Sequence, residues 1–417
     1  MKRRPHLHGR PRSLPLLLAA LYELAASGAC AQEAPTRRTG DEAAPDVPWP
    51  TQGWTRSTPE AEGLDPAPLR ALDGRIRAGE FGNVDRLVVV GNGRLVLDER
   101  YPRDYRAIAA AHWADQGEVA DTVSRSFNYQ HPDHHPYYGG RDVHTLQSVT
   151  KSVTSALVGI AIARGELEGV DAPMLGFFPD YEDLNPDPRL AEVTVEDLLT
   201  MRSGIEWHEH DRPIGPENTT IQLEESDDWF AFTLGQPMDA EPGTKWTYNS
   251  GGSHLLSGVV RQATGRLADA YAEEHLFGPL GIEDYHWKKT PRGVPDTEGG
   301  LYLEALDLAK IGYLYLRDGV WDGRRLLPEG WVEISTARIV DDVAPENPEW
   351  NAGYGYQWWR IDRGDLEIWA GLGYGDQFLL VLPARGIVAV SSAWNVFGPQ
   401  GSVLRSLVEA LDGAVGE

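Results

Sequence analysis

Runs of residues typical of β-strands lie at both ends of the chain, and helical patterns lie between them. Near the N-terminus, the runs 87–90 and 95–99 are separated by Gly91-Asn92-Gly93, which predicts a β-hairpin. After Tyr354, four further β-rich runs alternate with Gly, Asp and Pro. We therefore expect an α/β (α+β) fold. The two ends should pair in one antiparallel sheet flanked by helices, and the middle should form an inserted, mostly helical domain.

The length of 417 residues is long for one compact core and favours more than one structural unit. The expected organisation is a signal peptide (1–31), a flexible leader (32–50), a sheet domain formed by 51–164 plus 346–417, and an inserted helical domain (165–345). Amphipathic spacing and end signals predict helices at 66–78, with Asp65 as its cap, at 150–164, from Thr194 onward, at 250–264, at 299–318 and within 402–413.

The first 31 residues have the pattern of an export signal. A basic start precedes LPLLLAALYELAASGACA, which is interrupted by Glu23 and ends in a small-x-small signal peptidase pattern. We expect cleavage after Ala31 and a periplasmic or secreted protein. A retained membrane anchor is disfavoured because the apolar run is short and charged. Lipidation of Cys30 is disfavoured because Ser27 stands where an aliphatic residue is expected. Since Cys30 is the only cysteine, its removal would exclude disulfides and thiol catalysis.

The charge of the chain is strongly negative. The formal net charge of −25 argues against nucleic-acid binding, which requires a basic surface. The same charge favours solubility and repulsion from anionic membranes, and it carries no information about the fold.

The stretch LQSVTKSVTSALVGIAIARGEL places Ser148 three residues before Lys151. Positions i and i+3 of a helix face the same way, so the two side chains can meet. A serine hydroxyl needs a neighbouring base, and a lysine serves as one only when burial or nearby cations lower its pKa. The residues after Lys151 carry no charge until Arg164, which favours a buried lysine. The alternative is a capping serine beside a solvated lysine, and the motif alone does not decide between them.

Three segments together resemble the serine β-lactamase-related hydrolases. They are SVTKSVTSALVGIAIARGEL, VTVEDLLTMRSGI and PGTKWTYNSGGSHLLSGVV, and the resemblance extends over roughly residues 80–410. This superfamily includes class C β-lactamases, DD-peptidases, family VIII carboxylesterases and nylon-oligomer hydrolases. The resemblance implies a β-lactamase/transpeptidase-like fold and an acyl-enzyme mechanism without a cofactor or metal.

The resemblance also implies a set of site residues. Ser148 and Lys151 match the serine-x-x-lysine motif, and Tyr248 opens the second triplet as a proton relay that nearby cations can partly ionise. The backbone N–H groups of Ser148 and Tyr374 are expected to form the oxyanion hole. The residues expected to bind substrate are Asn249 and Ser250 of the second triplet and Gly371, Leu372 and Gly373, the best match to the third triplet.

Two departures from the family pattern bear on the substrate. The third triplet has no Lys or His, which in β-lactamases and peptidases helps to hold a substrate carboxylate. The second triplet has asparagine in the middle and ends in Ser250. Both departures favour an exported serine hydrolase that cleaves an ester or a short amide, with β-lactamase or DD-peptidase activity as the alternative. Four aromatic residues near the third triplet either wall an acyl pocket or pack the sheet: Trp358, Trp359, Trp369 and Tyr374.

Other functions find less support in the sequence. Two histidine-rich segments resemble metal sites, namely His131, Asp133, His134 and His135 in the polar segment 104–143, and His208, Glu209, His210 and Asp211. Pro132 and Pro136 disfavour a helical zinc site at the first segment, and we expect both segments to be solvated loops at the rim of the cleft. No Gly-x-Ser-x-Gly motif is present. A silent relative that only binds cell-wall fragments remains an alternative. We expect a small ester or amide as partner, no nucleic acid, and no stable membrane insertion after signal removal.

Overall fold

The computed structural model describes residues 49–104, 107–108, 110, 140–345, 347–396 and 401–415. The predicted signal peptide and the leader up to residue 48 lie outside the described residues, and so does most of the predicted loop at 104–143. Within the described ranges, no helix is long and apolar enough to cross a bilayer.

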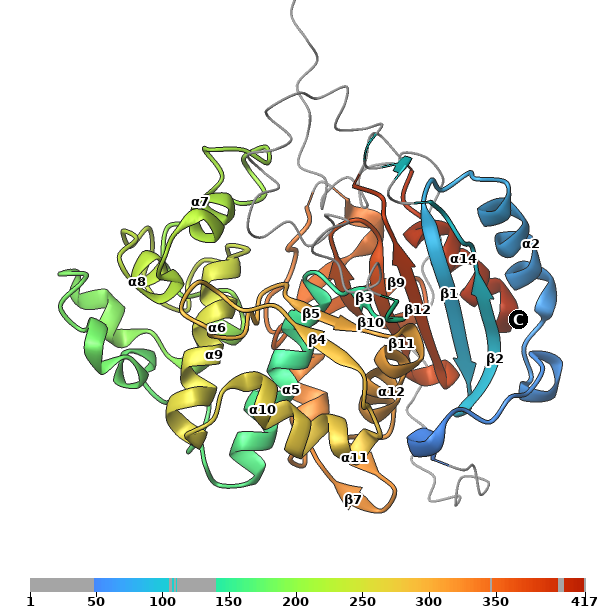
Figure 1. The fold of residues 1–417 in the computed structure, drawn as a ribbon, viewed down its shortest axis with the longest axis horizontal. Helices are drawn as coiled ribbons and strands as arrows, with labels where there is room; N and C mark the ends of the chain where they lie inside the picture. The colour runs from blue at the N-terminus through green and yellow to red at the C-terminus, as the bar shows by residue number, and fades with distance from the viewer. Residues whose placement is uncertain are drawn as a thin grey trace, which may run out of the picture.

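The main sheet joins the two ends of the chain. Among the described residues it has seven strands in the order β2-β1-β12-β11-β10-β9-β8, and every pair is antiparallel (Figure 1). The N-terminal hairpin therefore reaches the C-terminal strands through the pairing of β1 with β12. The strands are β1 (Val84–Gly91), β2 (Arg94–Arg100), β8 (Ala352–Tyr354), β9 (Trp359–Arg363), β10 (Leu366–Gly373), β11 (Gln377–Leu382) and β12 (Ile387–Ala393).

Helices cover both faces of this sheet, which explains why the central strands β11 and β12 are buried along their whole length. Leu87 and Val89 of β1 face a core shared with helices α2 (Pro66–Arg77) and α14 (Leu404–Val415). Val88 and Val90 face the opposite core, shared with α5 (Val149–Ala163) and α12 (Ala305–Leu316). The helix α12, which lies within the segment 165–345, thus packs directly on the sheet.

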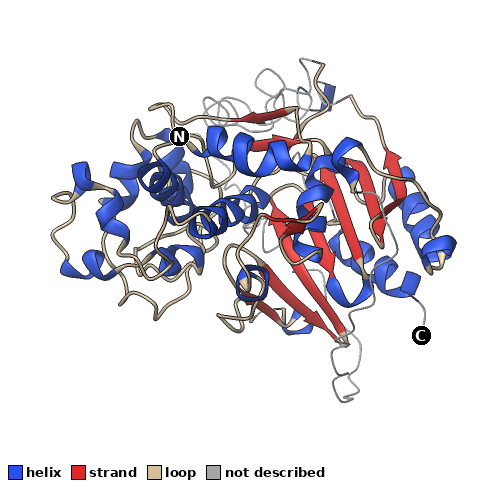
Figure 2. Cartoon of the chain, turned by 90° about the horizontal axis from the view of Figure 1, so that it is seen from below, coloured by secondary structure: helices blue, strands red, loops and turns tan. Residues whose placement is uncertain are grey.

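A mostly helical region lies beside the sheet (Figure 2). Its central helix is α9 (Ser250–Thr264), which packs against α5 and against α6 (Val195–Leu199) and α8 (Trp229–Leu234). The other α-helices of the described residues are α7 (Thr219–Glu225), α10 (Ala268–Ala272), α11 (Gly278–Leu280) and α13 (Trp331–Ser335), with a π-helical turn at Glu273–Phe277. Short 3₁₀ turns lie at Pro50–Gln52, Glu60–Glu62, Met174–Phe177, Pro179–Tyr181, Pro188–Glu192, Pro348–Trp350 and Pro383–Arg385.

Two small sheets complete the described fold. One has the order β3-β5-β4, with β3 at His144–Thr145, β4 at Tyr285–Trp287 and β5 at Leu301–Leu303. The other pairs β6 (Val320–Trp321) with β7 (Arg324–Arg325). The first of them reaches the candidate site, because β3 ends three residues before Ser148.

One predicted helix is wrong over its first part. The pattern at 299–318 predicted a single helix, but Leu301–Leu303 form β5 and the helix α12 begins only at Ala305. The reason is tertiary: the backbone of β5 pairs with β3 on one side and β4 on the other. A short apolar strand that runs directly into a helix shows the same local hydrophobicity as the helix itself.

Candidate active site

The turn that carries Ser148 has a constrained backbone conformation. Gln147 has φ +48°, a left-handed conformation that a non-glycine residue rarely adopts, and its side-chain amide donates to Thr145 Oγ1 at 3.0 Å. Ser148 itself occupies the cap position of α5 without using its hydroxyl as a cap. The structure thus excludes the capping alternative and leaves the Ser148 hydroxyl available for another role.

Strand β5 fixes this turn in place. The Leu146 N–H donates to the Leu301 carbonyl at 2.9 Å, and the Leu301 N–H donates to Thr150 Oγ1 at 3.2 Å. Residues on both sides of Ser148 are therefore hydrogen bonded to one residue of β5. The segment that the sequence assigned to a helix is one of the supports of the candidate nucleophile.

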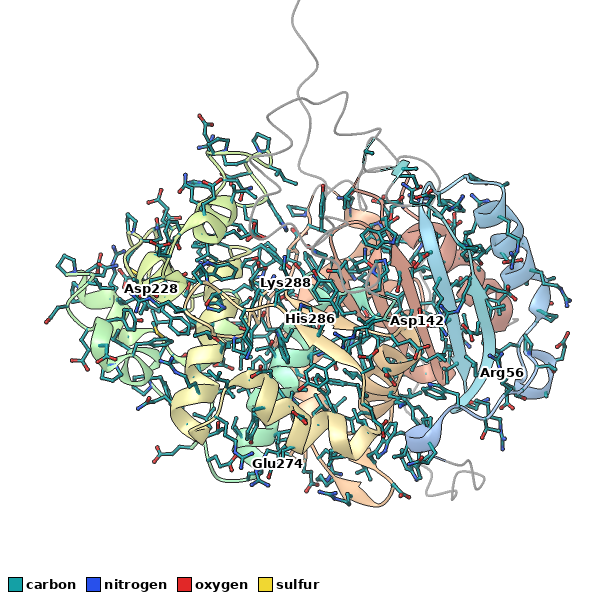
Figure 3. All side chains as sticks on the ribbon, viewed as in Figure 1. Arg56, Asp142, Asp228, Glu274, His286 and Lys288 are labelled. Carbon is teal, nitrogen blue, oxygen red and sulfur yellow. The ribbon has the colours of Figure 1, made fainter. Side chains whose placement is uncertain are left out.

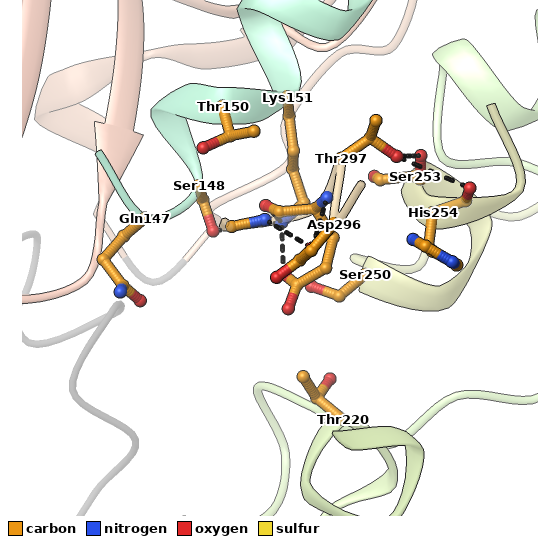
Figure 4. Close-up of polar contacts among 12 residues, drawn as sticks. Gln147, Ser148, Thr150, Lys151, Thr220, Ser250, Ser253, His254, Asp296 and Thr297 are labelled. Carbon is orange, nitrogen blue, oxygen red and sulfur yellow. Dashed lines mark hydrogen bonds and ion pairs between the residues drawn. The ribbon is translucent and has the colours of Figure 1, made fainter. Parts of the chain in front are cut away.

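Lys151 lies one turn further along α5 and is buried, with 1% of its surface exposed. Its Nζ atom donates to Ser148 Oγ at 3.0 Å, to the Glu298 carbonyl at 2.7 Å and to Glu298 Oε2 at 3.2 Å. Figure 4 shows the Ser148 and Lys151 side chains directed toward the same space, with Ser250 and Asp296 nearby. The solvated-lysine alternative is therefore excluded by the structure.

Tyr248 completes the group as a buried phenol hydrogen bonded with Ser148. Burial raises the pKa of Tyr248 well above its usual value, and the charges of Glu209 and Glu298 act in the same direction, while the hydrogen bond with Ser148 lowers it. The sequence-based expectation of a partly ionised phenol is wrong for this state. Lys151 Nζ lies 5.2 Å from the centroid of the Tyr248 ring, but burial and the two carboxylates outweigh it, so Tyr248 keeps its proton at neutral pH and is suited to donate it.

Aromatic rings hold the Tyr248 ring in position. The His210 ring stacks on it with a centroid distance of 4.4 Å and an interplanar angle of 15°, and Trp359 lies 6.0 Å away at 25°. The pKa of His210 is lowered to about 4 by burial, with a further contribution from the Lys151 charge. His210 is consequently a neutral imidazole beside the candidate site at neutral pH.

The side chains of the second triplet make contacts within the protein. The Ser250 hydroxyl donates to Glu209 Oε1 at 2.9 Å, and the Ser250 N–H donates to Glu209 Oε2 at 3.1 Å. The Asn249 side-chain oxygen caps α9 by accepting from the Gly252 N–H at 2.7 Å. Within the described part of the chain, the buried Asn249 Nδ2 has no hydrogen-bond partner. Of these two residues, Asn249 alone offers an uncommitted side-chain donor.

The third triplet lies directly against the Ser148 segment. A Cβ atom at Gly371 would lie 3.0 Å from Val149 Cγ1, and one at Gly373 would overlap the Leu146 carbonyl oxygen. Glycine at both positions therefore lets β10 approach the start of α5 closely. Tyr374 follows at the end of β10, in a turn held by the Gln377 amide, which donates to the Gly375 carbonyl at 3.0 Å. The oxyanion role of the Ser148 and Tyr374 amides stays a prediction.

The aromatic residues near the third triplet divide between two environments. Trp358 is fully buried and packs on Tyr315 of α12, with ring centroids 4.5 Å apart, so it belongs to the core. Trp359 points to the other side, toward Tyr248. The Trp369 indole N–H donates to Glu367 Oε1 at 2.9 Å. Trp359 is thus the tryptophan of this set that reaches the candidate site.

The two histidine-rich segments are the candidate metal sites of the sequence. His208 lies between Asp211 and Glu206, at 2.8 and 3.2 Å, and these two contacts raise its pKa, Asp211 more than Glu206. No group of three or more His, Cys, Asp or Glu residues that could hold a metal is found in the described ranges. The segment from His131 to His135 lies outside the described residues.

Sequence reasoning missed the carboxylates of this site. Glu298 reaches Lys151 across 147 positions of sequence, from the loop before β5. The sequence marks Glu209 only as a candidate metal ligand, whereas in the fold it accepts from the Ser250 hydroxyl and from the Trp207 indole N–H at 3.0 Å. No local periodicity or motif marks either residue, because both contacts depend on the tertiary fold.

The main sheet is antiparallel and flanked by helices, and a serine is paired with a buried lysine at the start of the helix α5. This combination defines a class of serine hydrolases, and the protein is an enzyme of that class. A family model described as Beta-lactamase matches residues 85–406, and the chain therefore belongs to the β-lactamase family.

The proteins to which the chain is similar include amide and ester hydrolases and a penicillin-binding protein of Amycolatopsis lactamdurans. The chain is 26% identical over 296 residues to 6-aminohexanoate-dimer hydrolase of Paenarthrobacter ureafaciens, covering 65% of this chain and 73% of the relative. It is 30% identical over 151 residues to esterase EstB of Burkholderia gladioli, covering 33% and 37%. Among solved structures, EstCE1, a hydrolase with promiscuous acyltransferase activity, has a TM-score of 0.60 at 14% identity over 84% of this chain and 98% of that one. This last similarity shows the fold alone.

Proposed function

We propose that the protein hydrolyses an ester or a short amide through an acyl-enzyme on Ser148. The observation that carries the proposal is the 3.0 Å contact between Lys151 Nζ and Ser148 Oγ, made by a lysine that is 1% exposed. A buried amine in contact with a hydroxyl is the arrangement that activates a serine without a histidine.

The proposed reaction follows from the geometry. Ser148 Oγ attacks the carbonyl carbon, and its proton passes to the Lys151 amine. The backbone N–H groups of Ser148 and Tyr374 receive the negative oxygen, and such donors typically contribute about 3 kcal/mol to transition-state stabilisation. The neutral Tyr248 phenol donates its proton to the leaving group and then recovers one from the Lys151 ammonium. Water attacks the acyl-enzyme by the same steps in reverse order.

The third triplet supports esters and short amides over β-lactams. Gly371 and Gly373 pack against the start of α5, so this strand segment carries no cation for a substrate carboxylate. The similarity to an amide hydrolase and to an esterase supports the same substrate class. The family description supports the alternative, a β-lactamase or DD-peptidase.

One labelling experiment and one substrate panel test this function. A fluorophosphonate probe should label the wild-type protein and fail to label Ser148→Ala. The wild type should turn over short-chain p-nitrophenyl esters or short amides in preference to a chromogenic cephalosporin. Equal labelling of both proteins would reject Ser148 as nucleophile, and faster turnover of the cephalosporin would establish the alternative.

We also propose that the protein is exported, on the basis of the signal pattern in the first 31 residues. Mass spectrometry of the protein secreted by a bacterial host should give an N-terminus at Gln32. Recovery of the full-length chain from the cytoplasm alone would contradict export.

A further inference from the structure

Glu298 holds the candidate base by two different atoms. Its backbone carbonyl accepts from Lys151 Nζ at 2.7 Å, and its side-chain Oε2 accepts from the same nitrogen at 3.2 Å. Glu298 is 5% exposed and Lys151 is 1% exposed, so the carboxyl and the amine meet away from water. The third contact of Lys151 Nζ is Ser148 Oγ. The lysine therefore lies between the candidate nucleophile and a carboxyl group.

This arrangement raises a chemical problem for the proposed function. In an ion pair with a carboxylate, the lysine is a protonated ammonium. An ammonium cannot accept the proton of Ser148. In a buried pair, however, the charged form loses hydration on both partners, which reduces its advantage over the form in which the proton has moved to the carboxyl group. In a buried lysine–carboxyl pair, the proton can therefore move to the carboxyl group, which leaves a neutral amine without loss of the proton to solvent.

The groups around Glu298 oppose further negative charge in this region. Glu224 of α7 interacts electrostatically with Glu298 and with Asp296 of the same loop. The Tyr248 phenol also interacts with Glu298. Lys288 is a nearby cation that interacts with all three carboxyl groups. Burial raises the pKa of Glu224 well above its usual value, and the charges of Glu298 and Asp296 add to this. Burial also lowers the pKa of Lys288 to about 8. Figure 3 places Lys288 between the helical region and the sheet.

We propose that Glu298 is a positioning residue that directs Lys151 at Ser148 and takes up the Lys151 proton when Ser148 reacts, so that the amine becomes available as a base. This inference rests on the proposed function of Ser148 and Lys151. The Glu298 carbonyl fixes the direction of Nζ, and the Glu298 carboxyl group stores the proton.

The proton balance of the step is closed. The Lys151 ammonium gives one proton to Glu298 Oε2, which yields an amine and a carboxylic acid. As the bond from Ser148 Oγ to the carbonyl carbon forms, the hydroxyl proton passes to Nζ. Tyr248 protonates the leaving group and is reprotonated by Lys151. When Glu298 returns its proton to Lys151, the initial ion pair is restored with no net gain or loss.

The proposal predicts the shape of a pH profile. A pair that shares one proton keeps a constant fraction of the amine form as the pH changes, so kcat/KM of the wild type should be flat around neutral pH. In Glu298→Gln, Lys151 has to release its proton to solvent before it can act. We expect kcat/KM to fall about 10-fold to 100-fold at pH 7, with KM unchanged, and to rise about tenfold per pH unit toward alkaline pH.

Two further variants make the test decisive. Glu298→Asp keeps an ionisable carboxyl group and should keep the flat profile at lower amplitude, which decides the matter even if the Gln variant does not fold. The matched control Glu224→Gln removes a carboxyl group from the same surroundings without touching Lys151 and should also keep the flat profile.

The outcomes separate this inference from the proposed function. If Glu298→Gln lowers kcat/KM by the same factor at every pH, or raises kcat/KM above the wild-type value at pH 7, Glu298 does not store the proton. An alkaline-rising profile in Glu298→Asp would have the same meaning. If the wild type shows no Ser148-dependent labelling by the fluorophosphonate, the proposed function itself fails.

Discussion

The imidazole of His210 lies parallel to the phenol of Tyr248, with ring centroids 4.4 Å apart and an interplanar angle of 15°. The two residues come from different segments, the loop after α6 and the turn before α9. Because the pKa of His210 is lowered to about 4 by burial, the imidazole is uncharged at neutral pH. The contact is thus a stack of two neutral rings, and its effect on Tyr248 is orientation.

This relationship predicts different results for two substitutions of His210. His210→Ala removes the stack and should lower kcat/KM for a p-nitrophenyl ester about 3-fold to 10-fold, the value of an aromatic pair of about 1 kcal/mol. His210→Phe keeps a ring over Tyr248 and should stay within about 2-fold of the wild type. A loss as large in His210→Phe as in His210→Ala would mean that the imidazole nitrogens take part directly.

Much of the secondary structure could be predicted because its signals are local. Asp65 caps α2 through the Ala67 N–H, Gly165 follows α5 at φ +70°, and Gly265 ends α9 at φ +70°. The hairpin turn has positive φ at Asn92 and Gly93, as two-residue turns between strands require. Each of these predictions is confirmed. The strand β5 was missed because its only evidence is pairing with β3 and β4, which are distant in sequence.

The same distinction applies to the candidate site. The short spacing between Ser148 and Lys151 could be interpreted from the sequence, since it depends on one helical turn. Tyr248 was added through family resemblance, and the structure brings it to Ser148. Glu298 and Glu209 could not be found in this way, because a carboxylate in a loop is usually solvated and only the tertiary fold buries these two beside Lys151 and Ser250.

The approach of β10 to the start of α5 predicts a severe effect of Gly373→Ala. The new methyl group would overlap the Leu146 carbonyl oxygen, which is backbone and cannot move aside alone. We expect a loss of about 1–3 kcal/mol in the free energy of unfolding and at least a 100-fold loss of esterase activity, because β10 shifts away from Ser148.

Gly74→Ala is the matched control for this variant. A Cβ atom at Gly74 meets nothing within 4 Å, and the residue is an exposed position of α2. Alanine there should raise the unfolding free energy by about 0.5–1 kcal/mol and leave activity unchanged. Urea unfolding and ester kinetics on both variants provide the test. Full activity in Gly373→Ala would show that the strand position does not control the site.

The contact between Ser250 and Glu209 predicts that Ser250 acts on stability more than on substrate binding. Ser250→Ala removes a buried hydrogen bond to a carboxylate and should lower the unfolding free energy by about 1–3 kcal/mol. The KM for a short ester should remain within about 2-fold of the wild type, because the hydroxyl is already occupied by Glu209. A large increase of KM at unchanged stability would instead support the substrate-binding role expected from the sequence.

His254 predicts a loss of stability at mildly acidic pH. It is 1% exposed, stands between Trp229 and Phe230, and has its pKa lowered to about 3 by burial. The folded state holds the neutral ring, whereas the unfolded state binds a proton below its ordinary pKa of 6.5. The unfolding free energy therefore falls as the pH drops from 6.5 toward 3. At pH 5 the loss from this residue is about 2 kcal/mol.

His254→Phe lacks the proton-binding ring, so its unfolding free energy should change less between pH 7 and pH 5 than that of the wild type. Urea titrations at the two pH values measure these changes. An equal change of unfolding free energy between pH 7 and pH 5 in both proteins would show that His254 does not contribute to the acid sensitivity.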